Sequence, residues 1–204
     1  MSFFSAEADG PKVADLAGVL CAHGQIATFG RTAARLSVVV DQPWRARLLA
    51  AELGACGVEA EVTTVNMSDG GYLLVRTAFR ADLLELAATF NRGAVKSLPP
   101  GFRLDGGKLR LWTLACGRAS ERGHLLPLDR RAPDTHRGLL AALGQIGLAG
   151  SIVGPRAGGP AVRVTGRRRL ASFAELIGEP PDGAEDVWPA PAGKTGWATD
   201  RVPC

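Results

Sequence analysis

The run Asp15–Gly24 constrains the fold of this chain more than any other stretch. Its small residues recur at helical spacing: Ala17, Gly18, Cys21 and Ala22. A helix face built from such residues is flat and lets a second helix backbone approach closely. The run therefore predicts a tightly packed helix pair, and we expect its partner helix to come from a second copy of the same unit within the chain.

The segments after this run predict one αββαββα unit over residues 12–91. Hydrophobic periodicity and turn residues indicate its elements in order: a helix over 12–23, a hairpin of strands at 25–29 and 35–40, a helix that begins at Pro43 and ends in 54–57, strands at 59–66 and 72–77, and a helix over 80–91. Residues 1–11 are expected to form a flexible leader, and Gly, Pro and Ser over 92–106 indicate a linker.

The same order returns after the linker, over residues 107–178. We expect a helix at 109–119, a strand at 123–129, a helix at 133–148, strands at 151–153 and 161–165, and a helix at 167–177. Matching residues support a duplication: Leu16, Val19 and Cys21 with Leu111, Leu114 and Cys116, and Val75-Arg76 with Val162-Arg163. The sequence thus predicts an α+β domain of two repeats, 12–91 and 107–178, followed by a disordered tail over 179–204.

Composition excludes several classes of protein. The N-terminus has no basic segment followed by an apolar one, and no apolar run is long enough to span a membrane. The four cysteines are scattered without the spacing of a zinc site, which fits buried free thiols in a reducing, cytoplasmic setting: Cys21, Cys56, Cys116 and Cys204. A formal net charge of +4 and a pI near 9.2 favour polyanionic partners only weakly.

The run Leu16–Gln25 resembles the LAGLIDADG motif of homing endonucleases. More closely, it is similar to the LAGLIDADG-like portion of the WhiA family of actinobacterial sporulation regulators, in which a comparable helix ends in Ala-His-Gly before a hairpin. The resemblance covers most of residues 12–178 and is weaker in the second half, at Leu111–Ala119. It implies two αββαββα halves related by a pseudo-twofold axis, whose sheets form a saddle that contacts DNA.

The resemblance also identifies the positions where the nucleases carry acidic residues at the ends of the two motif helices. This chain has His23 at the first position and Arg118 at the second. Mg²⁺ prefers oxygen ligands, and a guanidinium repels the cation. We therefore predict a non-catalytic domain with no catalytic residues, no metal and no cofactor. An active endonuclease would instead nick DNA with Mg²⁺ and lose this activity in His23→Ala.

Double-stranded DNA is the first candidate partner. Arginines are predicted on the strands, loops and last helix of the saddle: Arg31, Arg35, Arg76, Arg156, Arg163, Arg167, Arg168 and Arg169. The alternative for each is a solvated surface charge. Glu59 and Glu61 are acidic and the strand 73–75 is apolar, so the predicted saddle is not uniformly basic.

A protein partner is the second candidate. Trp188 and Trp197 are unusual in a solvated tail, and they either dock onto the chain's own surface or bind a partner. In this hypothesis the chain is an interaction module for a WhiA-like regulator or for a second copy of itself. Deletion of residues 180–204 would then abolish partner binding.

Overall fold

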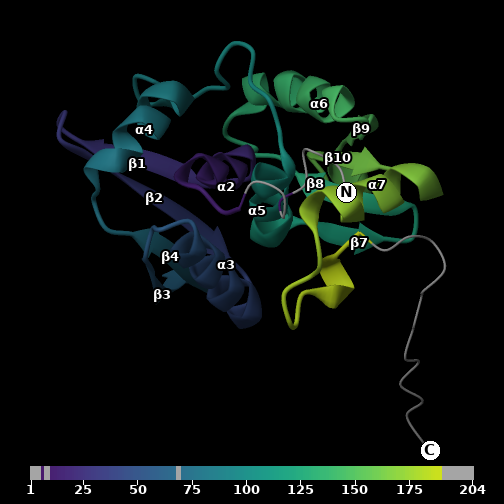
Figure 1. The fold of residues 1–204 in the computed structure, drawn as a ribbon, viewed down its shortest axis with the longest axis horizontal. Coiled ribbons are helices and arrows are strands. Elements are labelled where there is room, and N and C mark those ends of the chain that lie inside the picture. Colours follow the sequence, from purple (N-terminus) through teal and green to yellow (C-terminus); the bar gives the residue numbers. More distant parts are fainter. Residues whose placement is uncertain (1–5, 7–9, 68–69, 190–204) are drawn as a thin grey trace, which may run out of the picture.

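The computed structural model describes residues 6, 10–67 and 70–189 (Figure 1). The first half contains, in chain order, η1 (Val13–Leu16), α2 (Ala17–Cys21), β1 (Gln25–Phe29), β2 (Ala33–Val40), α3 (Pro43–Ala55), β3 (Ala60–Met67), β4 (Gly70–Thr77), η2 (Ala81–Leu83) and α4 (Leu84–Phe90). The short hairpin β5 (Asn91–Arg92) and β6 (Val95–Lys96) leads to the second half. That half contains α5 (Gly106–Cys116), β7 (Arg118–Ser120), β8 (Gly123–Pro127), η3 (Pro133–Thr135), α6 (His136–Gln145), β9 (Gly150–Val153), η4 (Pro155–Ala157), β10 (Ala161–Val164) and α7 (Arg167–Ile177).

The two halves have the same sheet topology. The first sheet has the strand order β1-β2-β4-β3 and the second has the order β7-β8-β10-β9, with antiparallel pairing throughout. This confirms the predicted α+β architecture of two αββαββα repeats. The predicted helix at 109–119 is too long, because the chain leaves the helix at Gly117 and Arg118 begins β7. A Cβ on Gly117 would lie 2.7 Å from the Thr113 carbonyl oxygen, so glycine allows this sharp exit.

Alternation along the strands sorts each sheet into two faces. In β2 the buried side chains are Ala34, Leu36, Val38 and Val40, and the residues between them are partly exposed. Helices α3 and α4 pack on the first sheet, and α6 and α7 pack on the second. We call the sheet face whose side chains alternate with the buried ones the open face. Along each strand, successive side chains therefore point alternately into the core and onto the open face.

The helix pair predicted from the small-residue run forms the centre of the molecule. Helices α2 and α5 lie side by side between the two sheets (Figure 1). A Cβ added to Gly18 would lie 1.9 Å from the Lys108 carbonyl oxygen, so the two backbones are in direct contact. Large aliphatic side chains beside this contact are completely buried: Leu16, Val19, Leu109 and Leu114. The prediction of a seam between two copies of one unit is confirmed.

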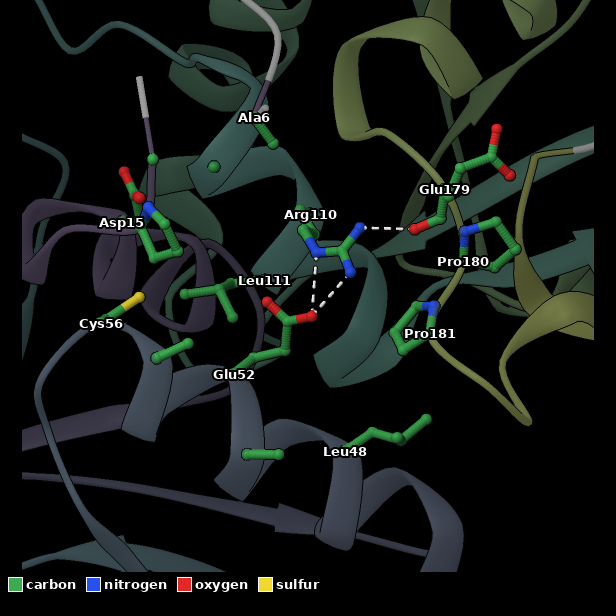
Figure 2. Close-up of a pocket in the computed structure, with 15 residues that line it drawn as sticks. Ala6, Asp15, Leu48, Glu52, Cys56, Arg110, Leu111, Glu179, Pro180 and Pro181 are labelled. Atoms are coloured by element: carbon green, nitrogen blue, oxygen red, sulfur yellow. Dashed lines mark hydrogen bonds and ion pairs between the residues drawn. The ribbon is translucent and has the colours of Figure 1, made fainter. Parts of the chain in front are cut away.

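The segment predicted to be a disordered tail differs from expectation over residues 179–189. Trp188 is 6% exposed, and its Nε1 donates a hydrogen bond to the Gly178 carbonyl oxygen at 2.8 Å. Arg110 of α5 holds the same segment, because its guanidinium lies over the Trp188 ring and donates to the Ile177 carbonyl oxygen. It also donates to the Glu179 carbonyl oxygen (Figure 2). Trp188 thus docks onto the chain's own surface, and its indole is not available to a partner. Trp197 lies outside the described residues.

A cavity of about 670 Å³ lies beside this segment, at the N-terminal ends of the paired helices. Its charged lining residues are Asp15, Glu52, Arg110 and Glu179, and the guanidinium of Arg110 is bound to the Glu52 carboxylate at 2.7 Å (Figure 2). The other lining residues are mostly apolar and include side chains of α3 and α5 as well as Pro180 and Pro181. This cavity lies away from the open face of the sheets.

One buried titratable side chain lies under the second sheet. His124 of β8 is 1% exposed and contacts the Phe173 ring edge-on, with 5.0 Å between the ring centroids. Neither ring nitrogen has a hydrogen-bond partner within the described residues. Burial, helped by the charge of Arg45, lowers the pKa of His124 to about 3. The imidazole is therefore a neutral core group at physiological pH.

This lowered pKa predicts a loss of stability in acid. The unfolded chain binds a proton at His124 near pH 6.5 and the folded chain only near pH 3, so the free energy of unfolding falls as pH falls through this interval. The expected slope from this group is about 1.4 kcal/mol per pH unit. Urea unfolding at a series of pH values measures it, and His124→Leu should remove this component. Equal acid sensitivity of the two proteins would contradict the assignment.

None of the helices within the described part of the chain has the length and apolar character needed to cross a lipid bilayer.

Candidate nucleic-acid interface

Strand register places four arginines on the open face of the two sheets. Arg35 of β2 lies between buried Ala34 and Leu36, so its side chain points away from the core. Arg76 of β4 pairs with Ser37, which has the same parity as Arg35. The second sheet repeats this arrangement, because Arg163 of β10 lies between two buried valines and pairs with Leu125. Arg118 of β7 pairs with the same Leu125, and it therefore joins Arg163 on this face.

The position of Arg118 corrects one prediction. It was expected at the end of the second motif helix, in the place that His23 has after the first. Instead it is a strand residue, in the register position that Gln25 has in the first sheet. Only Gly117 separates α5 from β7, whereas three residues separate α2 from β1. The shorter connection moves Arg118 out onto the sheet.

The open-face arginines have different partners. Arg76 forms an ion pair with Glu61 on the neighbouring strand β3, and both side chains are partly exposed. Arg118 donates instead to the Gly158 carbonyl oxygen at 2.7 Å, and Arg163 donates to the Ala157 carbonyl oxygen at 3.4 Å. Carbonyl groups orient these two guanidinium groups without neutralising their charge. The second sheet therefore presents two oriented positive charges.

The other predicted arginines lie in three places. Arg31 is exposed in the turn between β1 and β2, and Arg156 is exposed in η4, next to the loop that orients Arg118 and Arg163. The exposed run Arg167–Arg169 forms the first turn of α7, the helix that packs on the core face of the second sheet. The structure does not bring this run together with the strand arginines, and a phosphate contact by it stays a prediction.

A cavity of about 430 Å³ joins the two halves at the C-terminal ends of α2 and α5. The first half contributes His23, Gln25 and part of the open face of β2 and β4; the second contributes Arg118, the segment Pro127–Arg131 and the loop Gly158–Pro160. His23 is exposed, and its Nε2 donates to the Val39 carbonyl oxygen at 2.6 Å. Arg130 and Arg131 are exposed beside it. The cavity is thus the basic centre of the open face.

A buried ion pair closes the floor of this cavity. Lys96 donates from Nζ to Asp129 Oδ2 at 2.9 Å and to the Ala22 carbonyl oxygen at 2.6 Å. Asp129 also accepts from Gln25 at 3.0 Å and from the backbone N–H of Arg131 at 2.9 Å. Burial raises the pKa of Asp129, but the charge and hydrogen bond of Lys96 outweigh it, so the pKa is lowered; burial likewise lowers the pKa of Lys96 against the attraction of Asp129. The carboxylate is saturated by donors.

The second motif helix also ends on a buried cation. Arg45 of α3 is 5% exposed and donates to the carbonyl oxygens of Thr113 at 3.2 Å, Leu114, and Gly117 at 3.0 Å. Burial lowers the pKa of the Arg45 guanidinium. A cation at the C-terminus of a helix is favourable because the last carbonyls carry negative partial charge. Lys96 and Arg45 thus perform the same task at the ends of α2 and α5.

Sequence analysis missed several of these residues. Arg45 follows the spacing of the buried Leu49 and Leu53, so a charged residue on the apolar face of a helix was a detectable signal. Sequence analysis placed Lys96 in a linker and Asp129 at the end of a strand. No pattern in the sequence indicates that these two side chains form an ion pair. Among the described residues, no group of three His, Cys, Asp or Glu side chains lies close enough together to hold a metal ion.

No protein-family model matches the sequence, and no curated protein sequence matches it. Solved structures do match. The homing endonuclease I-WcaI bound to its DNA recognition sequence superposes with a TM-score of 0.61 and 13% identity, over 80% of this chain and 78% of that one. The fold is LAGLIDADG-like.

Two structures of DUF199/WhiA show the same fold. Its N-terminal LAGLIDADG domain gives a TM-score of 0.52 at 14% identity, with 82% of each chain covered. Full-length DUF199/WhiA from Thermatoga maritima gives 0.54 at 14% identity, over 82% of this chain and 55% of that chain. The LAGLIDADG-like fold expected from Leu16–Gln25 is confirmed.

Proposed function

We propose that the open face binds double-stranded DNA and that the chain acts as a non-catalytic, regulatory DNA-binding domain. One observation carries this proposal: strand register aligns Arg35 and Arg76 with Arg118 and Arg163 on one face that continues across the seam. Phosphate groups are recognised by such oriented guanidinium groups. The DNA-bound state of I-WcaI, which has the same fold, supports the choice of duplex DNA.

The absence of cleavage is proposed from the chemistry of the cavity floor. Mg²⁺ needs several oxygen ligands, usually carboxylates and water. Here His23 and Arg118 border the cavity, and Asp129 is bound by Lys96, Gln25 and a backbone N–H. Within the described part of the chain, Arg45 and Arg118 donate only to carbonyl oxygens, so they leave positive charge beside the cavity that repels a divalent cation. These residues do not fit a catalytic magnesium site.

Duplex binding tests the proposal. We expect affinity for a mixed-sequence duplex to fall by orders of magnitude between about 50 and 200 mM salt, because phosphate contacts release counterions. The double variant Arg118→Ala/Arg163→Ala should bind more weakly, with the slope of log K against log salt reduced by about 2. Fluorescence anisotropy measures both, and supercoiled plasmid incubated with Mg²⁺ should stay uncut.

The matched control is Arg47→Ala/Arg137→Ala, which removes the same charge from two exposed helix positions, in α3 and α6. It should retain most of the affinity and the salt slope. Equal losses in the two double variants would show that net charge, rather than the open face, governs binding. No binding by the unmodified protein at low salt, or nicking that disappears in His23→Ala, would refute the proposal.

A further inference from the structure

Two exposed phenylalanines form a cluster at the outer end of the first sheet. Phe29 is the last residue of β1 and is 67% exposed; Phe79 follows β4 and is 42% exposed. Their ring centroids are 5.6 Å apart, and the guanidinium of Arg35 lies 4.4 Å from the centre of the Phe79 ring. We call Phe29, Phe79 and Arg35 the aromatic tip.

The aromatic tip belongs to the open face. Arg35 and Phe29 lie on that face by register, and Phe79 joins them through its contacts with both side chains. Ala33 is opposite Phe29, and Ala27 is opposite Arg35. Small side chains at these two positions leave the rings exposed to anything that contacts the open face. A core role for the two rings is excluded by their exposure.

The charges around the tip that have no ion-pair partner among the described residues are positive. Arg31 is exposed in the adjacent turn, and Arg35 covers one face of Phe79. The nearby carboxylate of Asp82 is bound to Arg80 by two hydrogen bonds, of 2.9 and 2.6 Å. An exposed aromatic surface beside uncompensated arginines is complementary to nucleic acid, in which a π-face lies next to a phosphate. A protein partner would need acidic groups at the same points.

We propose that the aromatic tip binds a nucleobase that has left the regular stack of the duplex, with Phe29 stacking on the base and Arg31 and Arg35 holding the flanking phosphates. This inference rests on the proposed function and adds a ligand to it. The equivalent turn of the second half, between β7 and β8, carries Glu121 and Arg122. The contact is therefore made from one half only, and it fixes the orientation of the protein on DNA.

The test compares two probes: a mixed-sequence duplex and the same duplex with one unpaired nucleotide. An unpaired nucleotide removes the cost of unstacking, so the unmodified protein should bind the second probe more tightly, by on the order of tenfold. Phe29→Ala should abolish this preference while it keeps salt-dependent binding to the intact duplex. Phe29→Trp should restore it. Because Phe29 is 67% exposed, the alanine variant should retain the thermal stability of the parent.

Val95→Ala is the matched control, since Val95 is also a highly exposed apolar residue, at 61%, but lies on β6. It should leave the preference intact. Equal binding of both probes by the unmodified protein, or a preference that survives in Phe29→Ala, overturns the inference and leaves the proposed function standing. Failure to bind either probe at low salt refutes both. A self-association in sedimentation that is lost in Phe29→Ala, with the probe preference unchanged, assigns the tip to a protein partner and also overturns it.

Discussion

Replacing Gly18 by alanine is expected to destabilise the protein by about 3 kcal/mol or more. The added methyl group would lie 1.9 Å from the Lys108 carbonyl oxygen and 2.7 Å from its carbon, and backbone atoms cannot move aside as a flexible side chain can. Helices α2 and α5 must separate, which loosens the packing of the buried leucines on both sides of the seam. Urea unfolding at neutral pH measures the change.

Gly144→Ala provides the matched control for this substitution. Gly144 also lies inside a helix, α6, but a Cβ there meets no atom within 4 Å. Alanine has the higher helix propensity, so this variant should be more stable by about 0.5–1 kcal/mol. A Gly18→Ala protein that unfolds at the same urea concentration as the parent would show that the helices are not in backbone contact.

The second large effect is expected for Lys96→Met, which should cost about 3–5 kcal/mol. The substitution leaves Asp129 as an uncompensated buried charge and removes the cation from the Ala22 carbonyl oxygen. The free energy of unfolding, measured by urea titration, should therefore fall sharply, and Asp129→Leu in the same chain should recover much of the loss.

An exposed ion pair gives the comparison. Arg80 and Asp82 are partly exposed, with side-chain exposures of 34% and 43%, so Arg80→Met should change stability by less than about 1 kcal/mol. Additive effects of Lys96→Met and Asp129→Leu, instead of recovery in the double variant, would contradict a direct pairing of the two side chains.

Local patterns were sufficient where a single segment determines its own structure. The β-branched run 35–40 and the turn that follows 25–29 predict the first hairpin, although its second strand begins two residues earlier, at Ala33. The small-residue run predicts the seam. Short strands are harder to predict from the sequence. Strand β7 has only three residues, and nothing before Gly117 indicates that the helix ends there. A single glycine, at a position that leaves no room for a Cβ, was decisive.

The candidate site depends on contacts between distant segments, and these were not predictable from the sequence. Lys96 and Asp129 are separated by a helix and a hairpin in sequence, and only the closed fold places them 2.9 Å apart. The four strand arginines were individually visible, but their common face depends on register, which one sequence does not determine. For Trp188 the sequence left two alternatives open, docking onto the chain's own surface or binding a partner, and no pattern in 179–189 indicates that Arg110 holds it.

Each motif helix ends on a cation whose position depends on the other half of the chain. Arg45 of the first half binds the last carbonyls of α5 in the second half, and Asp129 of the second half holds Lys96 against the end of α2 in the first. We therefore expect that neither half folds on its own, because the second half alone would lack Arg45 and the first alone would lack Asp129, which fixes Lys96 at the end of α2. The repeated unit is completed only by its partner in the same chain.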